Sequence, residues 1–248
     1  MCSVSFIPRD DGDFVLAMNR DESRLRTPAL PPEVHHHDGL AMLFPRELSG
    51  GTWIGVNSSR MAFSLINWYS QPERTIPDAV SRGAVVRALL SARNREAAAL
   101  FLQDLPLERM NPFRLIVISS TERSLTEWRC DRGHLQHFRL AWRRQHWFSS
   151  ALNEARVNEI RGRIFARIPE DSLDSHSLRQ LHSSHAPEPG PLSVCMHRED
   201  ACTVSYTEIN LQGQVASMYY IAGPPCSRAP RFRLTLALDA GLALSEIA

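Results

Sequence analysis

The sequence contains no lysine, and all 28 of its cationic side chains are arginine. Enzymes that work through a lysine amine are therefore excluded, namely Schiff-base and pyridoxal-phosphate enzymes and Ser-Lys hydrolases. The Walker-A phosphate-binding loop also needs a lysine and is excluded for the same reason. No Gly-x-Gly-x-x-Gly run follows a predicted strand, so the sequence gives no support to a dinucleotide-binding fold.

Excess charge and long apolar runs are also missing. The 28 cationic side chains face 27 anionic ones, which leaves a net charge of +1 over 248 residues. A dedicated nucleic-acid-binding protein carries a clear basic excess, so we expect no nucleic-acid partner. No run approaches the roughly 18 apolar residues of a membrane-spanning helix, so we expect no membrane span.

Cysteine is scarce and scattered. The five cysteines are Cys2, Cys130, Cys195, Cys202 and Cys226. An odd number spread over a long chain is not typical of a disulfide framework. The first residues also lack the basic and apolar segments of a signal peptide. We therefore expect a cytoplasmic protein with reduced thiols.

The order of predicted elements indicates the fold class. Hydropathy patterns and turn residues predict strands over 2–8, 14–19, 52–56, 61–67, 113–119, 125–130, 135–140, 192–197, 202–210, 215–222 and 232–238, helices over 80–92 (with Asp78 as N-cap), 95–105, 153–168 and 175–185, and a loop over 27–38. Such segregation favours two mainly antiparallel sheets with helical layers, an α+β architecture. The length and the 43% hydrophobic content fit a single domain over residues 1–248.

The second residue of the chain is a candidate nucleophile. Methionine aminopeptidases remove Met1 when residue 2 is small, so we expect the mature chain to begin with Cys2. That residue would offer a thiol together with an α-amine whose pKa is about 7.7–8.0. The amine can accept the thiol proton, which places nucleophile and general base on one residue. A cysteine without a catalytic role is the alternative.

Charged residues of the second predicted strand would lie beside this cysteine. In a hairpin, the end of the second strand lies next to the start of the first. Here the second strand runs into Asn19, Arg20, Asp21 and Glu22. Arg20 would lower the pKa of the thiol, and Asp21 could accept a hydrogen bond from the α-amine. The alternative is a polar strand end whose charges are solvated.

Four motifs in the first 70 residues resemble the NRDE family, also called the transport and Golgi organisation 2-like family. They are Met-Cys at 1–2, Asn-Arg-Asp-Glu at 19–22, Gly-Gly-Thr-Trp-Ile-Gly-Val-Asn at 50–57 and Ala-Phe-Ser-Leu-Ile-Asn at 62–67. Their order and spacing match the family. The segment Asn-Pro-Phe-Arg-Leu at 111–115 is similar to a further strand motif of the family.

This resemblance implies a fold and a set of site residues. The family resembles the penicillin V acylase and bile salt hydrolase group, which are N-terminal-nucleophile (Ntn) cysteine hydrolases built as a four-layer αββα sandwich. It implies Cys2 as nucleophile, Asp21 as the residue that binds the α-amine, and Arg20 as positive charge near the thiol. Asn67 would donate to an oxyanion, a role worth roughly 2.7–4 kcal/mol. The alternative for Asn67 is a turn residue at a strand end.

Two further features of the resemblance stay open. The acylases use a second asparagine in mid-chain, and the nearest segment here is 149–153, which ends in Asn153. The glycine motif over 50–55 would form a tight turn into a strand, with Trp53 as an apolar anchor. It would serve as scaffold or as one wall of a pocket.

Histidines and cysteines outside these motifs could bind a metal. The run His35-His36-His37-Asp38 lies in a proline-rich segment, but consecutive histidines do not converge on one ion. Cys195, His197 and Cys202 are similar to part of a zinc site, but they offer only three ligands at a non-standard spacing. One face of a packed strand explains Cys195 and His197 better. We therefore expect no metal.

The segment around residue 140 has side chains that could bind haem or nucleic acid. His134, His137 and His146 could be axial haem ligands, although no Cys-x-x-Cys-His motif is present and nothing singles out one of them. Arginine and tryptophan side chains that could stack on nucleic acid are Arg139, Arg143, Arg144, Trp142 and Trp147. With a balanced net charge, an exposed strand or loop is the better interpretation of that segment.

Together these features predict a cysteine hydrolase that cleaves a carbon–nitrogen amide bond of a small molecule through an acyl-enzyme. Such an enzyme needs no cofactor. The alternative is a non-catalytic protein on the same fold that binds or transports haem, an acyl-CoA or a lipid, because eukaryotic relatives are linked to haem or lipid metabolism and transport.

Overall fold

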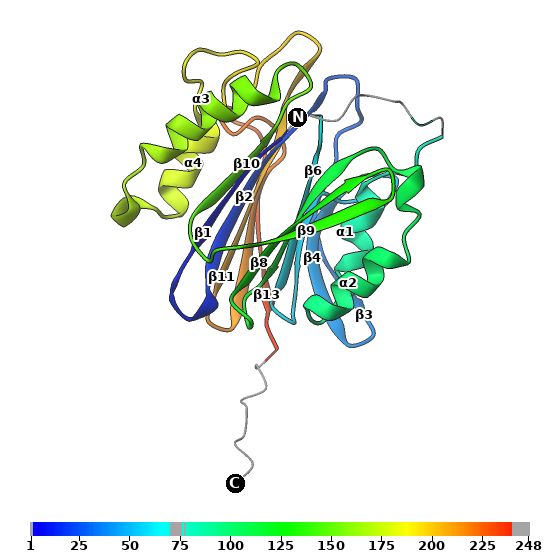
Figure 1. The fold of residues 1–248 in the computed structure, drawn as a ribbon. Coiled ribbons are helices and arrows are strands. Elements are labelled where there is room, and N and C mark those ends of the chain that lie inside the picture. The colour runs from blue at the N-terminus through cyan, green and yellow to red at the C-terminus, as the bar shows by residue number, and fades with distance from the viewer. Residues whose placement is uncertain (1, 70–75, 77, 240–248) are drawn as a thin grey trace.

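Two antiparallel sheets lie face to face, and helices cover the outer face of each (Figure 1). The computed structural model describes residues 2–69, 76 and 78–239. This is the αββα sandwich of the α+β class that the sequence predicts, so the predicted fold class is confirmed.

The first sheet has six strands and holds the N-terminal hairpin near its centre. Its strands in spatial order are β10 (Gln145–Ser149), β1 (Cys2–Pro8), β2 (Phe14–Ser23), β11 (Ala201–Gln212), β12 (Val215–Ile221) and β13 (Arg231–Ala237). All neighbouring strands pair antiparallel. The start of the chain is thus flanked by strands from its middle and its C-terminal part.

The second sheet has seven strands, which follow one another in sequence order. They are β3 (Leu30–His37), β4 (Leu40–Arg46), β5 (Ile54–Asn57), β6 (Met61–Asn67), β7 (Phe113–Ser119), β8 (Ser124–Asp131) and β9 (His134–Leu140). Each pairs antiparallel with the next, which makes a meander. The start of β1 and the end of β6 meet at the same end of the sandwich (Figure 1).

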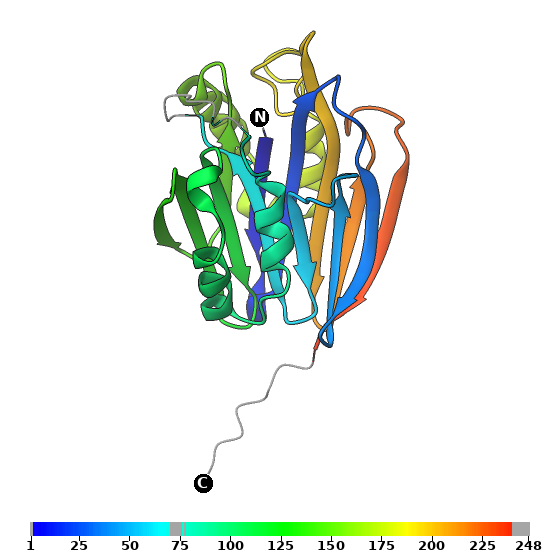
Figure 2. The ribbon, with the colours of Figure 1, turned by 90° about the vertical axis from the view of Figure 1, so that its right-hand side faces the viewer.

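In the described part of the chain, four α-helices form the outer layers. Helices α3 (Glu154–Ala166) and α4 (Ser175–Ser183) cover the six-stranded sheet, and α1 (Gly83–Leu89) and α2 (Arg95–Gln103) cover the seven-stranded one, facing the viewer in Figure 2. Three hydrophobic cores fill the spaces between the four layers. None of the helices in the described part of the chain is long and apolar enough to cross a bilayer.

Strand alternation decides which way the N-terminal side chains face. Val4 and Phe6 of β1 pack in the core between the sheets, whereas Ile7 packs in the core under α3 and α4. Successive side chains of a strand point to opposite faces. Cys2 therefore faces the inter-sheet space, and Ser3 faces the helices, where its hydroxyl accepts a hydrogen bond from Arg161 of α3.

Three strands differ from the sequence prediction. Residues 30–37 form β3, not the predicted loop, because the irregular pairing between Leu30 and Glu33 accommodates the two prolines on an edge strand. Strands β4 and β10 were not predicted. β10 is five residues long, too short for a periodic pattern to distinguish it from a loop.

One predicted strand is not formed, and one predicted helix begins later than expected. Residues 192–197 follow bends in the described structure, and only His197 makes an isolated bridge, to Cys202. Helix α1 begins at Gly83, three residues later than predicted, and its N-cap is Arg82. Asp78 lies outside the helix with a φ of 55°, because the chain turns there before it enters the helix.

Candidate active site

Cys2 lies at the end of the sandwich, where β1 begins between two neighbours. It pairs with Arg20 of β2 on one side and with Ser149 of β10 on the other. The residue is 8% exposed and borders the inter-sheet core. The hairpin geometry predicted from the sequence thus places Arg20 directly opposite Cys2.

A cavity of about 280 Å³ opens beside Cys2. Its walls include all four side chains that the sequence predicts as site residues, namely Cys2, Arg20, Asp21 and Asn67. Asn67 reaches it from the end of β6 in the opposite sheet. The cavity therefore joins two strand ends that are far apart in sequence.

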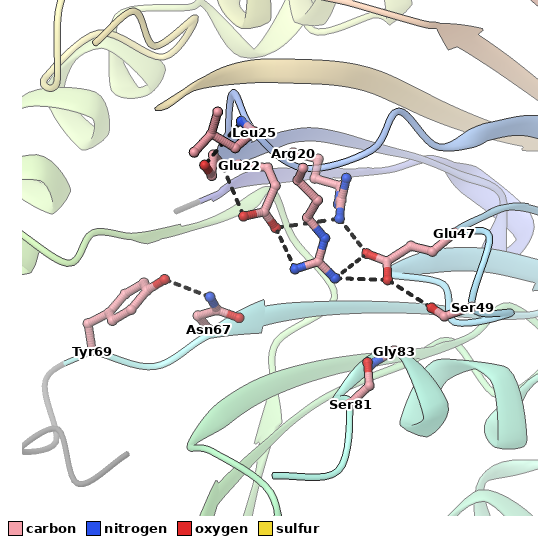
Figure 3. A network of polar contacts seen from close by, with 11 residues as sticks. Arg20, Glu22, Leu25, Glu47, Ser49, Asn67, Tyr69, Ser81 and Gly83 are labelled. Carbon is pink, nitrogen blue, oxygen red and sulfur yellow. Dashed lines mark hydrogen bonds and ion pairs between the residues drawn. The ribbon is translucent and has the colours of Figure 1, made fainter. Parts of the chain in front are cut away.

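Arg20 is the centre of a polar network on one wall of this cavity (Figure 3). Its guanidinium lies 4.4 Å from the ring centroid of Trp53 and forms ion pairs with Glu22, at 3.4 Å, and with Glu47. Arg26 contacts the same Glu47 carboxylate at 2.9 Å. Two arginines thus face two glutamates, and this network (Arg20, Glu22, Arg26 and Glu47) is close to neutral overall.

The glycine motif supports this wall. Gly51 lies against Gly83 at the start of α1, and a Cβ on Gly51 would meet the Cα of Gly83 at 3.2 Å. The amide of Thr52 donates a hydrogen bond to the Gly83 carbonyl at 3.1 Å. This close approach brings Trp53 under Arg20, so the motif is both scaffold and cavity wall.

Asp21 is buried on the helix side of the hairpin. Its carboxylate accepts a hydrogen bond of 2.7 Å from the Thr203 hydroxyl of β11. The Arg161 guanidinium of α3 lies 3.8 Å from the other carboxylate oxygen, and it donates to the Ser3 hydroxyl at 2.7 Å. Both Asp21 and Arg161 have no solvent-exposed side-chain surface.

Burial raises the pKa values of both Cys2 and Asp21. Burial raises the pKa of the Cys2 thiol, and the Asp21 amide and the Arg20 guanidinium oppose that shift without cancelling it. Burial also raises the pKa of Asp21, against the effects of Arg161 and Thr203. A further positive charge placed between Cys2 and Asp21 would stabilise the ionised form of both.

The opposite wall carries polar groups from the second sheet and from the segment before α1. The Asn67 amide donates a hydrogen bond of 2.6 Å to the Tyr69 hydroxyl (Figure 3). Arg82 also lines the cavity and donates to the Pro112 carbonyl at 3.0 Å. Burial lowers the pKa of Arg82, and the neighbouring Tyr69 and Cys2 oppose this shift. Asn111 lines the same cavity from the loop before β7.

Several of these residues were not predicted from the sequence. Arg82 and Thr203 are single polar residues that no local pattern distinguishes. Asn111 begins the segment 111–115, which is similar to a family motif, but the sequence predicted no role for its side chain. Arg161 did leave a signal, because it falls between Val157 and Phe165 at helical spacing on the buried face of α3. A charged residue on an apolar helix face needs a buried partner.

The remaining candidates lie elsewhere. His35, His36 and His37 follow one another along edge strand β3 and so alternate between its faces. His134 and His137 lie on β9, and His146 lies on β10 of the other sheet. The structure therefore does not bring these histidines together as a single ligand set.

Three other residues that the sequence analysis considered have structural roles. The Asn153 side chain accepts a hydrogen bond from the Arg156 amide and caps α3, outside the cavity lining. Trp142 packs edge-on against Phe6 at 5.0 Å between ring centroids. Trp147 is buried and donates to Glu127 at 3.3 Å.

We expect His182 to make the protein sensitive to acid. This side chain of α4 is fully buried, contacts the Ser5 hydroxyl at 3.0 Å, and has its pKa lowered to about 3 by burial and by Arg161. The unfolded chain binds a proton near pH 6.5 and the folded one does not, so the free energy of unfolding should fall between about pH 6.5 and pH 3 by roughly 1.4 kcal/mol per pH unit. Urea unfolding at several pH values measures this slope.

A variant at His182 separates the contribution of this side chain to the pH dependence of the unfolding free energy from the contribution of the carboxylates. His182→Gln should flatten the slope in this pH window, whereas His176→Gln, at an exposed position of the same helix, should leave it unchanged. Equal slopes for all three chains would contradict the prediction.

Known proteins resemble this chain in sequence and in fold. The family model described as transport and Golgi organisation 2 matches residues 1–183. No curated protein matches the sequence. Among solved structures, a penicillin V acylase from Agrobacterium tumefaciens aligns with a TM-score of 0.53 at 11% identity, over 94% of this chain and 86% of that one.

Two structures of a conjugated bile acid hydrolase from Clostridium perfringens are also similar. A cysteine-to-alanine mutant aligns with a TM-score of 0.55 at 11% identity, over 94% of this chain and 92% of that one. An arginine-to-leucine variant aligns with a TM-score of 0.52 at 10% identity, over 98% of this chain and 100% of that one. At such low identity the likeness concerns the fold, which is that of an Ntn hydrolase.

Proposed function

The chain belongs to the transport and Golgi organisation 2 family, and on that premise we propose that it is an N-terminal-cysteine hydrolase of small-molecule amides. One observation carries the proposal: Cys2, Arg20, Asp21 and Asn67 come from three strands of two sheets and line one cavity. Nucleophile, positive charge, carboxylate and amide donor are the groups that an acyl-transfer site requires.

Removal of Met1 would create the general base. The α-amine would then belong to Cys2 itself, next to the buried Asp21 carboxylate. In its ammonium form it would stabilise both the thiolate and the carboxylate, whose pKa values are raised by burial. In its neutral form it can take the thiol proton. Asp21 would orient the amine, because Thr203 and Arg161 hold the carboxylate in place.

The proposed reaction has two steps. The Cys2 sulfur attacks the amide carbonyl carbon while its proton passes to the α-amine. The carbon–nitrogen bond then breaks, the leaving amine takes that proton, and a thioester remains. In the second step the α-amine accepts a proton from water, the hydroxide attacks the thioester, and the carboxylic acid and the free thiol are released.

Asn67 would stabilise the oxyanion of both steps. One hydrogen of its amide nitrogen is donated to Tyr69, and the second is the one we assign to the oxyanion. The bond to Tyr69 fixes the orientation of the carboxamide before substrate binds. Such preorganisation is what makes an amide donor effective in this role.

The cavity suggests a small acyl group as the bound part of the substrate. A volume of about 280 Å³ is near the lower end of ligand pockets. A second cavity, of about 270 Å³, shares Arg20, Glu22 and Arg26 and extends along β11 and β12. It would accept the leaving part. Penicillin V, which is named in a related structure and carries a small acyl group, is a suitable first probe.

Limited alkylation tests the nucleophile directly. We expect mass spectrometry of the purified chain to show Met1 removed, and limiting iodoacetamide at mildly acidic pH to label Cys2 before the other cysteines. The labelling is carried out on chelator-treated protein, so that no bound metal masks a thiol. Cys226 is then the internal comparison, because it is the exposed cysteine and a merely accessible thiol would react there first.

A chain with a non-removable N-terminal extension is the matched control. Its Cys2 keeps the thiol but has no α-amine, and burial raises the pKa of that thiol. Labelling of Cys2 should therefore be much slower in the extended chain. A processed chain whose Cys2 reacts no faster than in the extended one would overturn the proposed activation and favour a binding role for the fold.

A further inference from the structure

Outside the cavity, two histidines and two cysteines meet at one point of the molecule. They are His185, Cys195, His197 and Cys226, and their ligand atoms all lie within 4.8 Å of one another. His185 follows α4, Cys195 and His197 belong to the loop before β11, and Cys226 belongs to the loop between β12 and β13. Three separate chain segments therefore converge here.

Four distances between ligand atoms of this cluster are close to those of a tetrahedron around a metal ion. With Zn–N bonds of about 2.05 Å and Zn–S bonds of about 2.3 Å, tetrahedral ligand atoms lie about 3.3 Å (N to N), about 3.6 Å (N to S) and about 3.8 Å (S to S) apart. Here the Nε2 atoms of His185 and His197 lie 3.2 Å apart. The Sγ atoms of Cys195 and Cys226 lie 3.5 and 3.4 Å from His197 Nε2, and 3.5 Å from each other.

Hydrogen bonding alone does not explain this arrangement. Nε2 of a histidine has one in-plane direction and can make one good hydrogen bond. His197 Nε2 nevertheless has the other three ligand atoms within 3.5 Å. We propose that His185, Cys195, His197 and Cys226 bind one zinc ion. Two thiolates and two neutral imidazoles neutralise Zn²⁺, which suits a partly buried site.

Four protein ligands leave no open coordination position, so the ion has a structural role. The loop over 184–197 carries three of the four ligands and also contacts the residues that hold Asp21. Its Pro191 and Leu192 carbonyls accept hydrogen bonds from Arg161 at 3.2 and 3.3 Å. The Met196 amide donates to the Thr203 hydroxyl at 2.8 Å, and that hydroxyl binds Asp21. Zinc would hold the loop that positions Asp21.

The sequence hides this site because its ligands are spaced irregularly. In the sequence, Cys195 and His197 group naturally with the nearby Cys202, which leaves no fourth ligand. The structure instead brings in His185, which is ten residues before Cys195, and Cys226, which is 29 residues after His197. Cys202 is not part of the cluster, although its backbone forms a bridge with His197.

Metal content of the full-length chain tests the site. We expect the protein, purified with a reducing agent and without chelator, to contain one zinc per chain by plasma mass spectrometry. Cys195→Ser and Cys226→Ser should each lower the zinc content at least tenfold. Cys202→Ser, the neighbouring cysteine outside the cluster, should keep one zinc per chain.

Cobalt provides a measurement that does not depend on how the variants fold. Chelator-treated wild-type chain, reduced and titrated with Co²⁺, should develop the intense visible absorption of tetrahedral cobalt and the ultraviolet band of thiolate ligation at one equivalent. Zinc should then displace the cobalt. Reduced wild-type chain that takes up neither metal would refute the site.

The zinc site is independent of the proposed hydrolase activity. The titration can be repeated on a Cys2→Ala chain, which should bind one equivalent of Co²⁺ like the wild type. Zinc binding by an inactive protein would support the site, and loss of binding in Cys2→Ala would place the metal at Cys2 and overturn the assignment.

Discussion

A chain with Cys2→Ala is expected to lose all detectable turnover of any amide that the wild-type chain hydrolyses. The thiol is the group that would bond to the acyl carbon, so its removal leaves no route to the thioester. The α-amine of the processed chain remains, but it cannot form the intermediate. Release of the amine product, measured with equal amounts of processed wild-type and variant protein, gives the result.

The alanine side chain should leave the fold intact, because Cys2 lies at the first position of β1 and at the rim of the inter-sheet core. Thermal unfolding should therefore differ little between the two chains. Cys130→Ala is a matched control at a buried cysteine of the other sheet, and it should retain turnover. Normal turnover by Cys2→Ala would show that Cys2 is not the nucleophile.

The largest effect on stability is expected from Arg161→Met. Arg161 has no exposed surface, lies 3.8 Å from Asp21, and donates hydrogen bonds to Ser3 and to the Pro191 carbonyl. Methionine removes the cation that lies against the buried Asp21 carboxylate. Breaking a buried pair in this way costs about 3–5 kcal/mol of unfolding free energy. Urea unfolding at neutral pH measures the loss.

Two further variants separate a specific loss from a general effect on α3. Arg163→Met removes an arginine of the same helix whose side chain is 70% exposed and paired with Glu159, and it should cost at most about 0.5 kcal/mol. The double variant Arg161→Met with Asp21→Asn should recover part of the loss, because the buried negative charge is then removed together with the cation that opposed it. Equal costs for the two single variants would contradict this account.

These two predictions depend on different kinds of information. Cys2 and its hairpin partner Arg20 were found from the sequence, because a short turn fixes which residues of two adjacent strands face each other. Arg161 and Thr203 are 140 and 182 residues away from Asp21, and no local pattern connects them to it.

The sequence by itself determined the fold class, most strands and the family. Alternating strands, capped helices and turn glycines leave strong local patterns, and four short motifs were sufficient to identify the family. The same patterns misassigned β3 and the segment 192–197, where prolines and bends obscure the periodicity.

Only the tertiary structure decided which polar groups share a site. It placed Asn67 in the same cavity as Cys2, enclosed Asp21 with Arg161 and Thr203, and joined His185 and Cys226 to Cys195 and His197. Each of these groups of residues comes together only because sheets, helices and loops from distant parts of the chain pack against one another. Local sequence encodes the periodicity of one element, whereas the chemistry of a site depends on side chains that several elements contribute.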